Sequence, residues 1–397
     1  MAKELSEFEA YNHINQLFGG SARMAEEVEK VDIIPSTSIA LDRALGVGGW
    51  PRGRIIQLAG QPSSGKTLLS LVAIAEWQRK DPENCAAFLD AEYTYDAKWA
   101  EQLGVDNRRI LLVKDNSGVN LFTGLIGQKK INPTTKKVTK IPGLLDFIAE
   151  KKIIKAKHPE TNETITINCG KLGVIVLDSV ASVNTPTEDH SEVGKQNMAL
   201  MGRFLSVELK KLTPAVAHAN VAFIAINQVR TNLGQMFGDP TSTSGGNAWK
   251  HACSVMVMLA PKQAKESKIL DSHEEQIGGR IMAKITKNKV AAPFKSAEYD
   301  LLFDSGVTNR EEEMIETGVL VGVIQRPNNR SYVILDEKLG SRAEAIEFVK
   351  ANYEKVSEQV RANFGMNSQV ASAFEGEEAD NPFSSDASEE LTFDSEE

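Results

Sequence analysis

Residues 55–67 read IIQLAGQPSSGKT, and this stretch decides the fold class. Residues 55–59 form a short apolar run typical of a buried strand, and residues 67–79 have helical periodicity. Between them, residues 60–67 fit the pattern G-x-x-x-x-G-K-[ST], whose glycines let backbone N–H groups turn onto phosphate oxygens. The N-terminus of the following helix adds a favourable dipole. The stretch therefore predicts a nucleotide phosphate loop.

Further apolar runs bounded by turn residues predict the rest of a sheet. They cover residues 86–90, 174–178 and 221–227, with a helical pattern at 198–212, and later runs at 254–260, 281–286 and 297–303. Alternation of strands and helices favours an α/β fold with a mostly parallel central sheet and helices on both faces. The expected organisation is an N-terminal helix and linker at 1–33, a nucleotide-binding core at 34–308, a small α/β C-terminal domain at 309–365 with an amphipathic helix at 342–364, and a disordered tail at 366–397.

Composition excludes several classes of protein. The chain has 397 residues, 41% hydrophobic and 25% charged, as in an ordinary globular protein. It lacks both the ~18 consecutive apolar residues of a membrane span and an apolar secretory segment at its charged start. Three widely spaced cysteines argue against a disulfide scaffold or a zinc site. We expect a cytosolic protein without a membrane partner.

The net charge of −9 is unevenly distributed. Residues 374–397 hold ten Asp or Glu and no Lys or Arg, so subtracting this tail leaves +1 for residues 1–373. The acidic total therefore does not exclude DNA binding.

A lysine-rich insertion lies within residues 115–172. Nine lysines fall between Lys129 and Lys157, against only Asp146 and Glu150. One interpretation is a solvated insertion with an amphipathic helix at 143–157. The other is an auxiliary contact to a phosphate backbone.

Polar residues follow the predicted strands where nucleotide chemistry needs them. Lys66 is expected to reach the β and γ phosphates, and Thr67 with Asp178 to hold Mg²⁺. Asp90 and Glu92 follow another strand, and residue chemistry alone leaves open which of them orients water and whether either forms a structural salt bridge.

The fourth strand ends in Asn227 and Gln228, where ligands bind open α/β sheets. Residues 231–247 follow it without periodicity, which favours a functional or mobile loop over a plain surface excursion.

Together these motifs resemble the RecA recombinase family of bacteria and phages, over residues 31–364. The specific stretches are LDRALGVGGWPRGRIIQLAGQPSSGKT, FLDAE, VIVLDSVAS, AINQVRTNLGQMFGDPTSTSGGNAWK and KITKNKVAAPFKSAEYDLLF. The resemblance implies a P-loop RecA-type ATPase core. It also implies that Glu92 rather than Asp90 is catalytic, that Gln228 senses the γ-phosphate, and that DNA-binding loops lie at 188–198 and 229–245.

The resemblance further assigns site residues. Lys287 and Lys289 are implied to act on the nucleotide of a neighbouring protomer, with Lys250 at the same interface. Nucleotide contacts are implied for Gly60, Gln61, Pro62, Ser63, Ser64, Gly65, Lys66, Thr67, Leu68, Asp96, Trp99 and Lys250. DNA contacts are implied for Met198, Arg203, Arg230, Met236, Phe237, Gly245, Gly246 and Asn247.

These assignments lead to one functional expectation and two alternatives. We expect a DNA-dependent ATPase that uses ATP and Mg²⁺, polymerises on single-stranded DNA, and pairs that strand with homologous double-stranded DNA. It would act in the cytoplasm of a bacterium or of a phage-infected host. The alternatives are a ring-forming motor such as a helicase, and a regulatory ATPase without strand exchange. Four departures from the family pattern mark a divergent member. His251 replaces a usual aromatic interface residue, and Asn232 stands where a lysine is common. The lysine-rich insertion is additional, and the N-terminal region matches weakly.

Overall fold

The computed structural model describes residues 13, 15–17, 31–133, 135–157, 164–185, 198–231, 241–262 and 267–364. The chain divides into two units, Met1–Asp32 and Ile33–Glu397. In the first unit, His13 and Asn15–Leu17 are helical. Most of the predicted N-terminal helix and the whole predicted tail, residues 366–397, lie outside the described residues.

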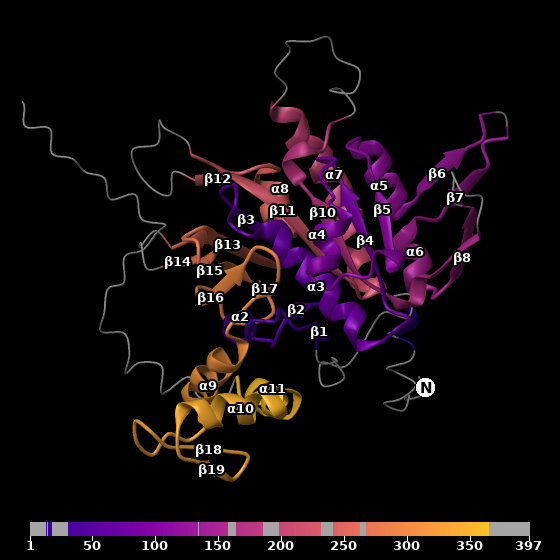
Figure 1. The fold of residues 1–397 in the computed structure, drawn as a ribbon. Coiled ribbons are helices and arrows are strands. Elements are labelled where there is room, and N and C mark those ends of the chain that lie inside the picture. Colours follow the sequence, from indigo (N-terminus) through magenta and orange to yellow (C-terminus); the bar gives the residue numbers. More distant parts are fainter. Residues whose placement is uncertain are drawn as a thin grey trace, which may run out of the picture. The chain divides into compact units, whose positions relative to one another are not determined.

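The second unit is built on one large sheet (Figure 1). Its parallel strands are, in spatial order, β13 (Val255–Pro261), β3 (Arg54–Gly60), β11 (Ala222–Thr231), β10 (Leu172–Asp178), β4 (Cys85–Asp90) and β5 (Ile110–Val113). Antiparallel strands extend it beyond β13: β15 (Gln276–Asn288), β16 (Ser296–Leu302) and β17 (Gly306–Val307). Short strands β12 (Thr241–Thr243) and β14 (Lys268–Leu270) pair with β11 and β15. The predicted mostly parallel α/β sheet is confirmed.

Apolar side chains cover both faces of this sheet. In β10, Val174 and Val176 belong to the cluster that contains α3 (Lys66–Lys80) and α2 (Ile39–Leu45), whereas Ile175 and Leu177 belong to the opposite cluster. That second cluster holds α5 (Gly118–Ile126), α6 (Leu144–Ala149), α7 (Met198–Ala219) and α8 (Gly246–Ala252). Burial on two faces explains why the strands are continuous apolar runs rather than alternating ones.

Short elements complete this part of the chain. A helix α4 (Ala97–Gln102) follows β4, and β1 (Ile33–Ile34) pairs with β2 (Trp50–Pro51). Single 3₁₀ turns lie at Asn107–Arg109, Cys169–Lys171 and Val180–Ser182. Because β3, β4, β10 and β11 are parallel, their carboxyl ends lie at the same edge of the sheet. This edge carries the polar residues described below.

The C-terminal region has its own small core. It comprises α9 (Arg310–Leu320), a hairpin of β18 (Tyr332–Ile334) and β19 (Glu337–Leu339), α10 (Arg342–Ala351) and α11 (Tyr353–Ala362). The single helix predicted at 342–364 is wrong, because Asn352 separates two helices. The backbone N–H of Asn352 and its side-chain amide both donate to the Phe348 carbonyl, at 3.0 and 2.9 Å, which ends α10.

The lysine-rich insertion forms two hairpins around α6. One pairs β6 (Gln128–Ile131) with β7 (Val138–Ile141), and the other pairs β8 (Ile153–Lys157) with β9 (Thr164–Asn168). The helix predicted at 143–157 is therefore wrong beyond Ala149. Lys151 takes a left-handed φ of 51°, and Ile154 packs with Ile167 against the core, so strand pairing replaces the predicted helix.

Candidate nucleotide site

The phosphate loop joins β3 to α3 with tightly constrained backbone. A Cβ on Gly60 would lie 2.4 Å from the Leu259 carbonyl oxygen and 2.5 Å from the Ser64 hydroxyl, so only glycine fits there. The Lys66 ammonium donates to the Gln61 carbonyl at 2.7 Å and reaches the Ser64 hydroxyl at 3.4 Å. These are loop oxygens, so the ammonium is held at the N-terminus of a 15-residue helix, where phosphate groups bind favourably.

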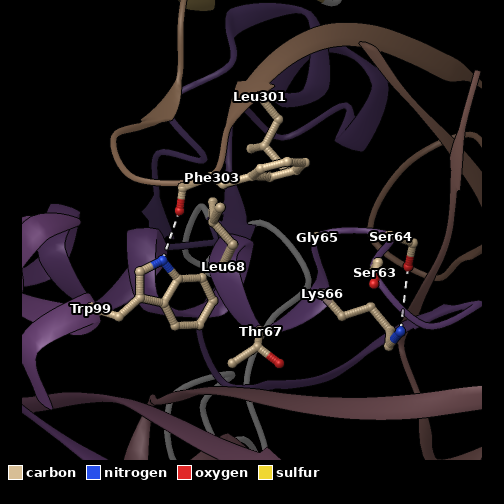
Figure 2. Close-up of a pocket in the computed structure, with 9 residues that line it drawn as sticks. All are labelled: Ser63, Ser64, Gly65, Lys66, Thr67, Leu68, Trp99, Leu301 and Phe303. Carbon is tan, nitrogen blue, oxygen red and sulfur yellow. Dashed lines mark hydrogen bonds between the residues drawn. The ribbon is translucent and has the colours of Figure 1, made fainter. Parts of the chain in front are cut away.

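A cavity of about 380 Å³ opens beside this loop (Figure 2). Its lining consists of Ser63, Ser64, Gly65, Lys66, Thr67, Leu68, Trp99, Leu301 and Phe303. Figure 2 shows Trp99, Leu301 and Phe303 on one side, and Lys66 with the two serines on the other. The Trp99 indole N–H donates to the Phe303 carbonyl at 2.7 Å, which fixes the ring. The cavity therefore has one end suited to phosphates and one suited to a flat aromatic base.

Thr67 and Asp178 meet at the polar end. The Thr67 hydroxyl donates to Asp178 Oδ2 at 2.9 Å, and Asp178 is only 3% exposed. The pKa of Asp178 is raised to about 6, chiefly by burial and also by the Glu92 and Asp90 carboxylates, while the Thr67 hydrogen bond and Lys66 oppose the rise. Burial lowers the pKa of Lys66, and the charges of Asp178 and Glu92 partly offset this.

The Thr67 and Asp178 pair fits Mg²⁺ in chemistry and number. Mg²⁺ is usually bound through one or two protein oxygens, with water and nucleotide phosphates completing its shell. Within the described ranges, there is no group of three or more His, Cys, Asp or Glu side chains that could hold a metal ion. A hydroxyl with one carboxylate is thus a suitable partial shell for a nucleotide-bound Mg²⁺, and unsuitable for an all-protein metal cage.

Glu92 lies just after the end of β4, beside the end of β10 and Gln228 of β11. Its Oε1 accepts hydrogen bonds from the Ser179 hydroxyl, from the Ser182 hydroxyl at 3.1 Å, and from the Gln228 amide at 3.4 Å. The two serines follow β10, and Gln228 stands opposite Gly60 in the register of β11 with β3. These contacts orient the carboxylate and connect it to Gln228.

Asp90 has a different role in this structure. Its two oxygens accept from the backbone N–H groups of Thr94 and Tyr95, each at 3.0 Å, and the side chain is fully buried. Because the carboxylate is fully buried and each oxygen already accepts a bond within this turn, Asp90 is poorly placed to orient a water molecule. The geometry favours Glu92 for that role.

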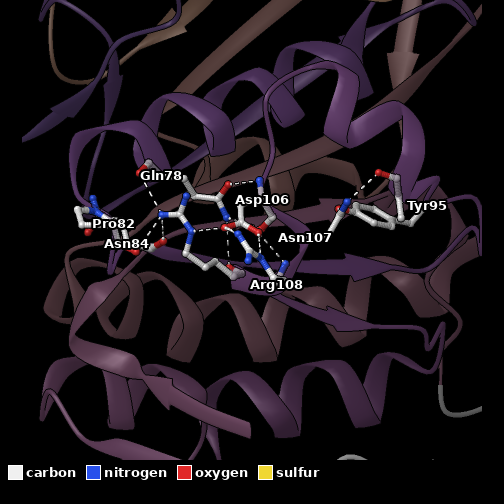
Figure 3. Close-up of polar contacts among 9 residues, drawn as sticks. Gln78, Pro82, Asn84, Tyr95, Asp106, Asn107 and Arg108 are labelled. Atoms are coloured by element: carbon white, nitrogen blue, oxygen red, sulfur yellow. Dashed lines mark hydrogen bonds and ion pairs between the residues drawn. The ribbon is translucent and has the colours of Figure 1, made fainter.

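A polar network that the sequence motifs do not indicate holds Trp99 in place. Asp96, predicted as a nucleotide contact, caps α4 here: its Oδ1 accepts from Lys98 N–H at 2.8 Å and Trp99 N–H at 3.1 Å. Figure 3 shows how the flanking loop is anchored. The Tyr95 hydroxyl donates to Asn107 at 2.7 Å, and Asp106 N–H donates to the Gln78 side chain of α3 at 2.8 Å.

Arg109 completes this network. One of its guanidinium nitrogens lies 3.1–3.3 Å from the backbone carbonyls of Gln78, Asp81, Pro82 and Asn84, and its Nε donates to Asp106 at 3.0 Å. The segment that follows α4, the helix that carries Trp99, is therefore tied to the C-terminal end of the same helix α3 that begins at the phosphate loop.

A second unpredicted network connects Asn227 of β11 to Gln57 of β3 and to α8. The Asn227 side-chain amide donates to Gln57 Oε1 at 3.1 Å and to the Ser244 carbonyl at 2.9 Å, and the buried Trp249 indole donates to the same Gln57 oxygen at 2.7 Å. Asn227 precedes Gln228, and Ser244 follows the segment 232–240, which is outside the described residues. Asn227 therefore ties the residue before Gln228 to the chain just ahead of α8.

The three lysines assigned to a protomer interface gather at the end of α8. Lys287 donates to the Lys250 carbonyl, and Lys289 donates to the His251 carbonyl at 2.7 Å. Burial lowers the pKa of Lys287, and neighbouring Lys289 lowers it further. None of the three lines the Trp99 cavity of its own chain, as far as the described residues show.

The implied DNA contacts are only partly described. Arg203 is exposed on α7, and Gly245, Gly246 and Asn247 form the start of α8. Met236 and Phe237 lie outside the described residues, as do residues 188–197 and the side chains of Met198 and Arg230.

Among the described helices, none combines the length and the apolar composition that a membrane span requires.

Comparisons with known proteins show that this chain is similar to RecA proteins along most of its length. The profile of the RecA N-terminal domain matches residues 5–125 and 158–308, and omits 126–157 within the insertion. Protein RecA of Campylobacter lari is 35% identical over 360 residues, covering 89% of this chain and 91% of its own length. Protein RecA of Helicobacter pylori strain G27 is 33% identical over 91% of this chain and 93% of its own. The chain belongs to the RecA family.

Proposed function

We propose that this chain is an ATP-hydrolysing recombinase, a DNA-dependent ATPase that pairs homologous strands in DNA recombination and repair. Membership of the RecA family along about 90% of the chain supports this function over a ring-forming helicase. The observation that carries the ATPase assignment is the set of hydrogen bonds from Ser179, Ser182 and Gln228 to Glu92 beside the phosphate loop.

The nucleotide is proposed to be ATP with Mg²⁺. Lys66 and the backbone of the loop would bind its phosphates, Thr67 and Asp178 would hold the metal, and Trp99 would face the base. When bound, Mg²⁺ neutralises charge on the transferring phosphoryl group. The carboxylate of Asp178 is already aligned by the Thr67 hydroxyl, so little reorganisation is needed on binding.

Glu92 is proposed as the general base. Its carboxylate would orient the attacking water and accept a proton from it, as a positioned acid or base does in such reactions. The hydroxyls of Ser179 and Ser182 fix the carboxylate before the reaction. Gln228 bonds the same carboxylate and leads into the proposed DNA-binding loop, so nucleotide state and DNA grip would be coupled through this side chain.

Filament formation is proposed to complete the site. Lys287, Lys289 and Lys250 would act on the nucleotide of a neighbouring protomer, where cations stabilise the developing charge. The proposed partners are copies of this chain, single-stranded DNA and homologous double-stranded DNA, held by Arg203, the start of α8 and the two loops. The proposed N-terminal segment 1–33 would join protomers, and the site of action would be the cytoplasm of a bacterium or of an infected host.

Two assays on the full-length protein test this function. Phosphate release from ATP with Mg²⁺ should rise when single-stranded DNA is added, and a labelled single strand should be exchanged into a homologous linear duplex. Hydrolysis that ignores DNA, together with failure to exchange strands, would contradict the recombinase and favour a regulatory ATPase.

A further inference from the structure

Two exposed hairpins carry most of the unpaired positive charge of the insertion. We call them the lysine-rich arms: residues 128–133 with 135–141, and the outer face of the described parts of β8 and β9. Within the described chain, Lys140 is paired with Asp146 and Lys152 with Glu150. Six further lysines are exposed and make no ion pair to any described residue: Lys129, Lys130, Lys136, Lys137, Lys151 and Lys155.

The first arm is firmly anchored. Gly127 has a left-handed φ of 71°, and a Cβ there would lie 2.2 Å from the Ile141 carbonyl oxygen; a Cβ on Gly143 would lie 2.3 Å from Gly127 N. Asp146 accepts from Gly143 N–H at 3.0 Å and from Lys140 at 2.8 Å. The hairpin thus leaves the helices α5 and α6 in a defined direction, so its lysines are presented from a fixed base.

The second arm has one apolar and one polar face. Ile154 stands opposite Ile167, and both pack against the core. On the other face, exposed Lys155 stands opposite exposed Thr166, and Ile153 opposite Asn168. Ammonium, hydroxyl and amide groups are the side-chain types that most often contact phosphate oxygens, and no acid interrupts this described face.

Beyond the ion pair of Lys140 with Asp146, no described contact in the fold explains the charge of the first arm. Lys129 lies directly opposite Lys140 in the register of β6 and β7, where like charges destabilise a hairpin, and no ion pair to a described residue offsets the charge of Lys129. The RecA profile omits residues 126–157, so the family fold does not require this segment. A polyanion would neutralise the repulsion and give the lysines a function.

The aromatic content of the arms distinguishes between single-stranded and double-stranded nucleic acid as their ligand. In the described parts of residues 128–168, the sole aromatic side chain is Phe147, which packs against the core. Unpaired bases need aromatic stacking platforms, which these arms do not offer. A charged surface without them fits the continuous phosphate backbones of a duplex. Figure 1 shows the arms beside α5 and α6, away from β12 and β14.

We propose that the lysine-rich arms bind the phosphate backbone of double-stranded DNA, as a capture surface separate from the strand-exchange site. This inference rests on the proposed function only in taking homologous duplex DNA as a partner. Binding is electrostatic and independent of sequence, and it holds a duplex near the filament while homology is searched.

The test is duplex binding by the full-length protein, measured as the fluorescence anisotropy of a labelled random-sequence duplex over a salt series. One triple variant removes arm charge: Lys130→Ala, Lys136→Ala and Lys137→Ala. The matched control removes the same charge from exposed lysines elsewhere: Lys210→Ala, Lys268→Ala and Lys338→Ala. Thermal unfolding of both variants verifies that they fold.

The arm variant should bind the duplex about tenfold more weakly, and its salt slope should fall by about 0.9 for each phosphate that the removed lysines neutralise. The control should bind like the unaltered protein, and hydrolysis stimulated by single-stranded DNA should stay within about twofold of normal in both variants. Equal weakening in the arm variant and the control would overturn the proposal, and so would unchanged binding by the arm variant. A selective loss of filaments on single-stranded DNA would instead make the arms a subunit interface. Since duplex binding is measured without hydrolysis, failure of the ATPase assignment would remain distinguishable.

Discussion

The nucleotide site and the lysine-rich arms differ in the burial and pairing of their charged side chains. At the nucleotide site, Asp178 and Asp90 are buried and each has a defined hydrogen-bond partner. On the arms, lysines such as Lys136 and Lys137 are exposed and unpaired among the described residues. Buried groups must be satisfied by the fold, so motif and geometry agree there. An exposed ammonium is solvated by water and needs no partner in the fold, so the explanation for these lysines is sought in a binding partner.

The largest effect is expected at Glu92. Glu92→Gln should slow DNA-stimulated ATP hydrolysis by about 100- to 10,000-fold, because an amide cannot act as the base. Nucleotide binding should remain, since Lys66, Thr67 and Asp178 are intact. Phosphate release and equilibrium binding of a fluorescent ATP analogue measure the two effects. Glu101→Gln, on the exposed side of α4, is the control and should hydrolyse ATP normally.

A smaller effect is expected at the apolar end of the cavity. Trp99→Ala should weaken nucleotide binding by about 5- to 150-fold, the usual range for losing an aromatic partner of a base. Trp99→Phe retains a ring and should recover most of the affinity, as titration of the fluorescent analogue would show. If phenylalanine binds as poorly as alanine, the indole hydrogen bond to Phe303, rather than stacking, holds the site together.

A buried carboxyl outside the nucleotide site, Glu313, tests whether burial alone makes a charged group affect the stability of the fold, in contrast to the exposed lysines of the arms. Glu313 on α9 accepts from the Ser38 hydroxyl and from Ala40 N–H at 2.9 Å, and burial raises its pKa to about 7, with Asp42 adding and Arg310 opposing. The folded chain thus holds a proton that the unfolded chain releases from about pH 4.5 upward, so this group makes stability fall as pH rises from about 4.5 to 7.

Glu313→Gln removes this titration and retains an oxygen acceptor. At pH 8 the variant should be more stable than the unaltered protein by roughly 2 kcal/mol, and the gap should close near pH 4, below the ordinary pKa of the carboxyl. Urea unfolding at the two pH values measures it. Glu312→Gln provides a comparison on the same helix, where the Arg342 ion pair lies at the surface. A gap that is independent of pH would contradict the assignment.

The smallest effect is expected from Ser182. Its hydroxyl is one of three donors to Glu92, at 3.1 Å, and a single hydrogen bond contributes about 1 kcal/mol. Ser182→Ala should therefore reduce hydrolysis by about fivefold, while Ser179 and Gln228 keep the carboxylate oriented. Steady-state kinetics at saturating ATP would detect it. A reduction as large as that of Glu92→Gln would show that the base is positioned by one hydroxyl rather than by three donors.

The sheet was predictable because strands buried on both faces are continuous apolar runs. The phosphate loop was predictable because its glycines, lysine and threonine fit a specific motif next to a strand and a helix. The expected strand at 174–178 is β10 (Leu172–Asp178), and the expected helix at 67–79 is α3 (Lys66–Lys80). The choice between Asp90 and Glu92 was not predictable from residue chemistry, since both are acids after the same strand. Only the backbone donors at Thr94 and Tyr95 separate them.

Surface segments and long-range polar contacts were harder to predict. The helix expected at 143–157 ends at Ala149, and Ile154 instead stands opposite Ile167 in a strand pair, where both side chains pack against the core. The network of Gln57, Asn227 and Trp249 joins three residues far apart in the chain, and no local pattern contains it.

The most direct test of the central claim is electron microscopy of the purified protein with single-stranded DNA, Mg²⁺ and a slowly hydrolysed ATP analogue. If nucleotide joins the Glu92 site of one protomer to Lys287 and Lys289 of the next, continuous helical filaments will form with the analogue and be absent without it. Closed rings or isolated particles under the same conditions would contradict the account.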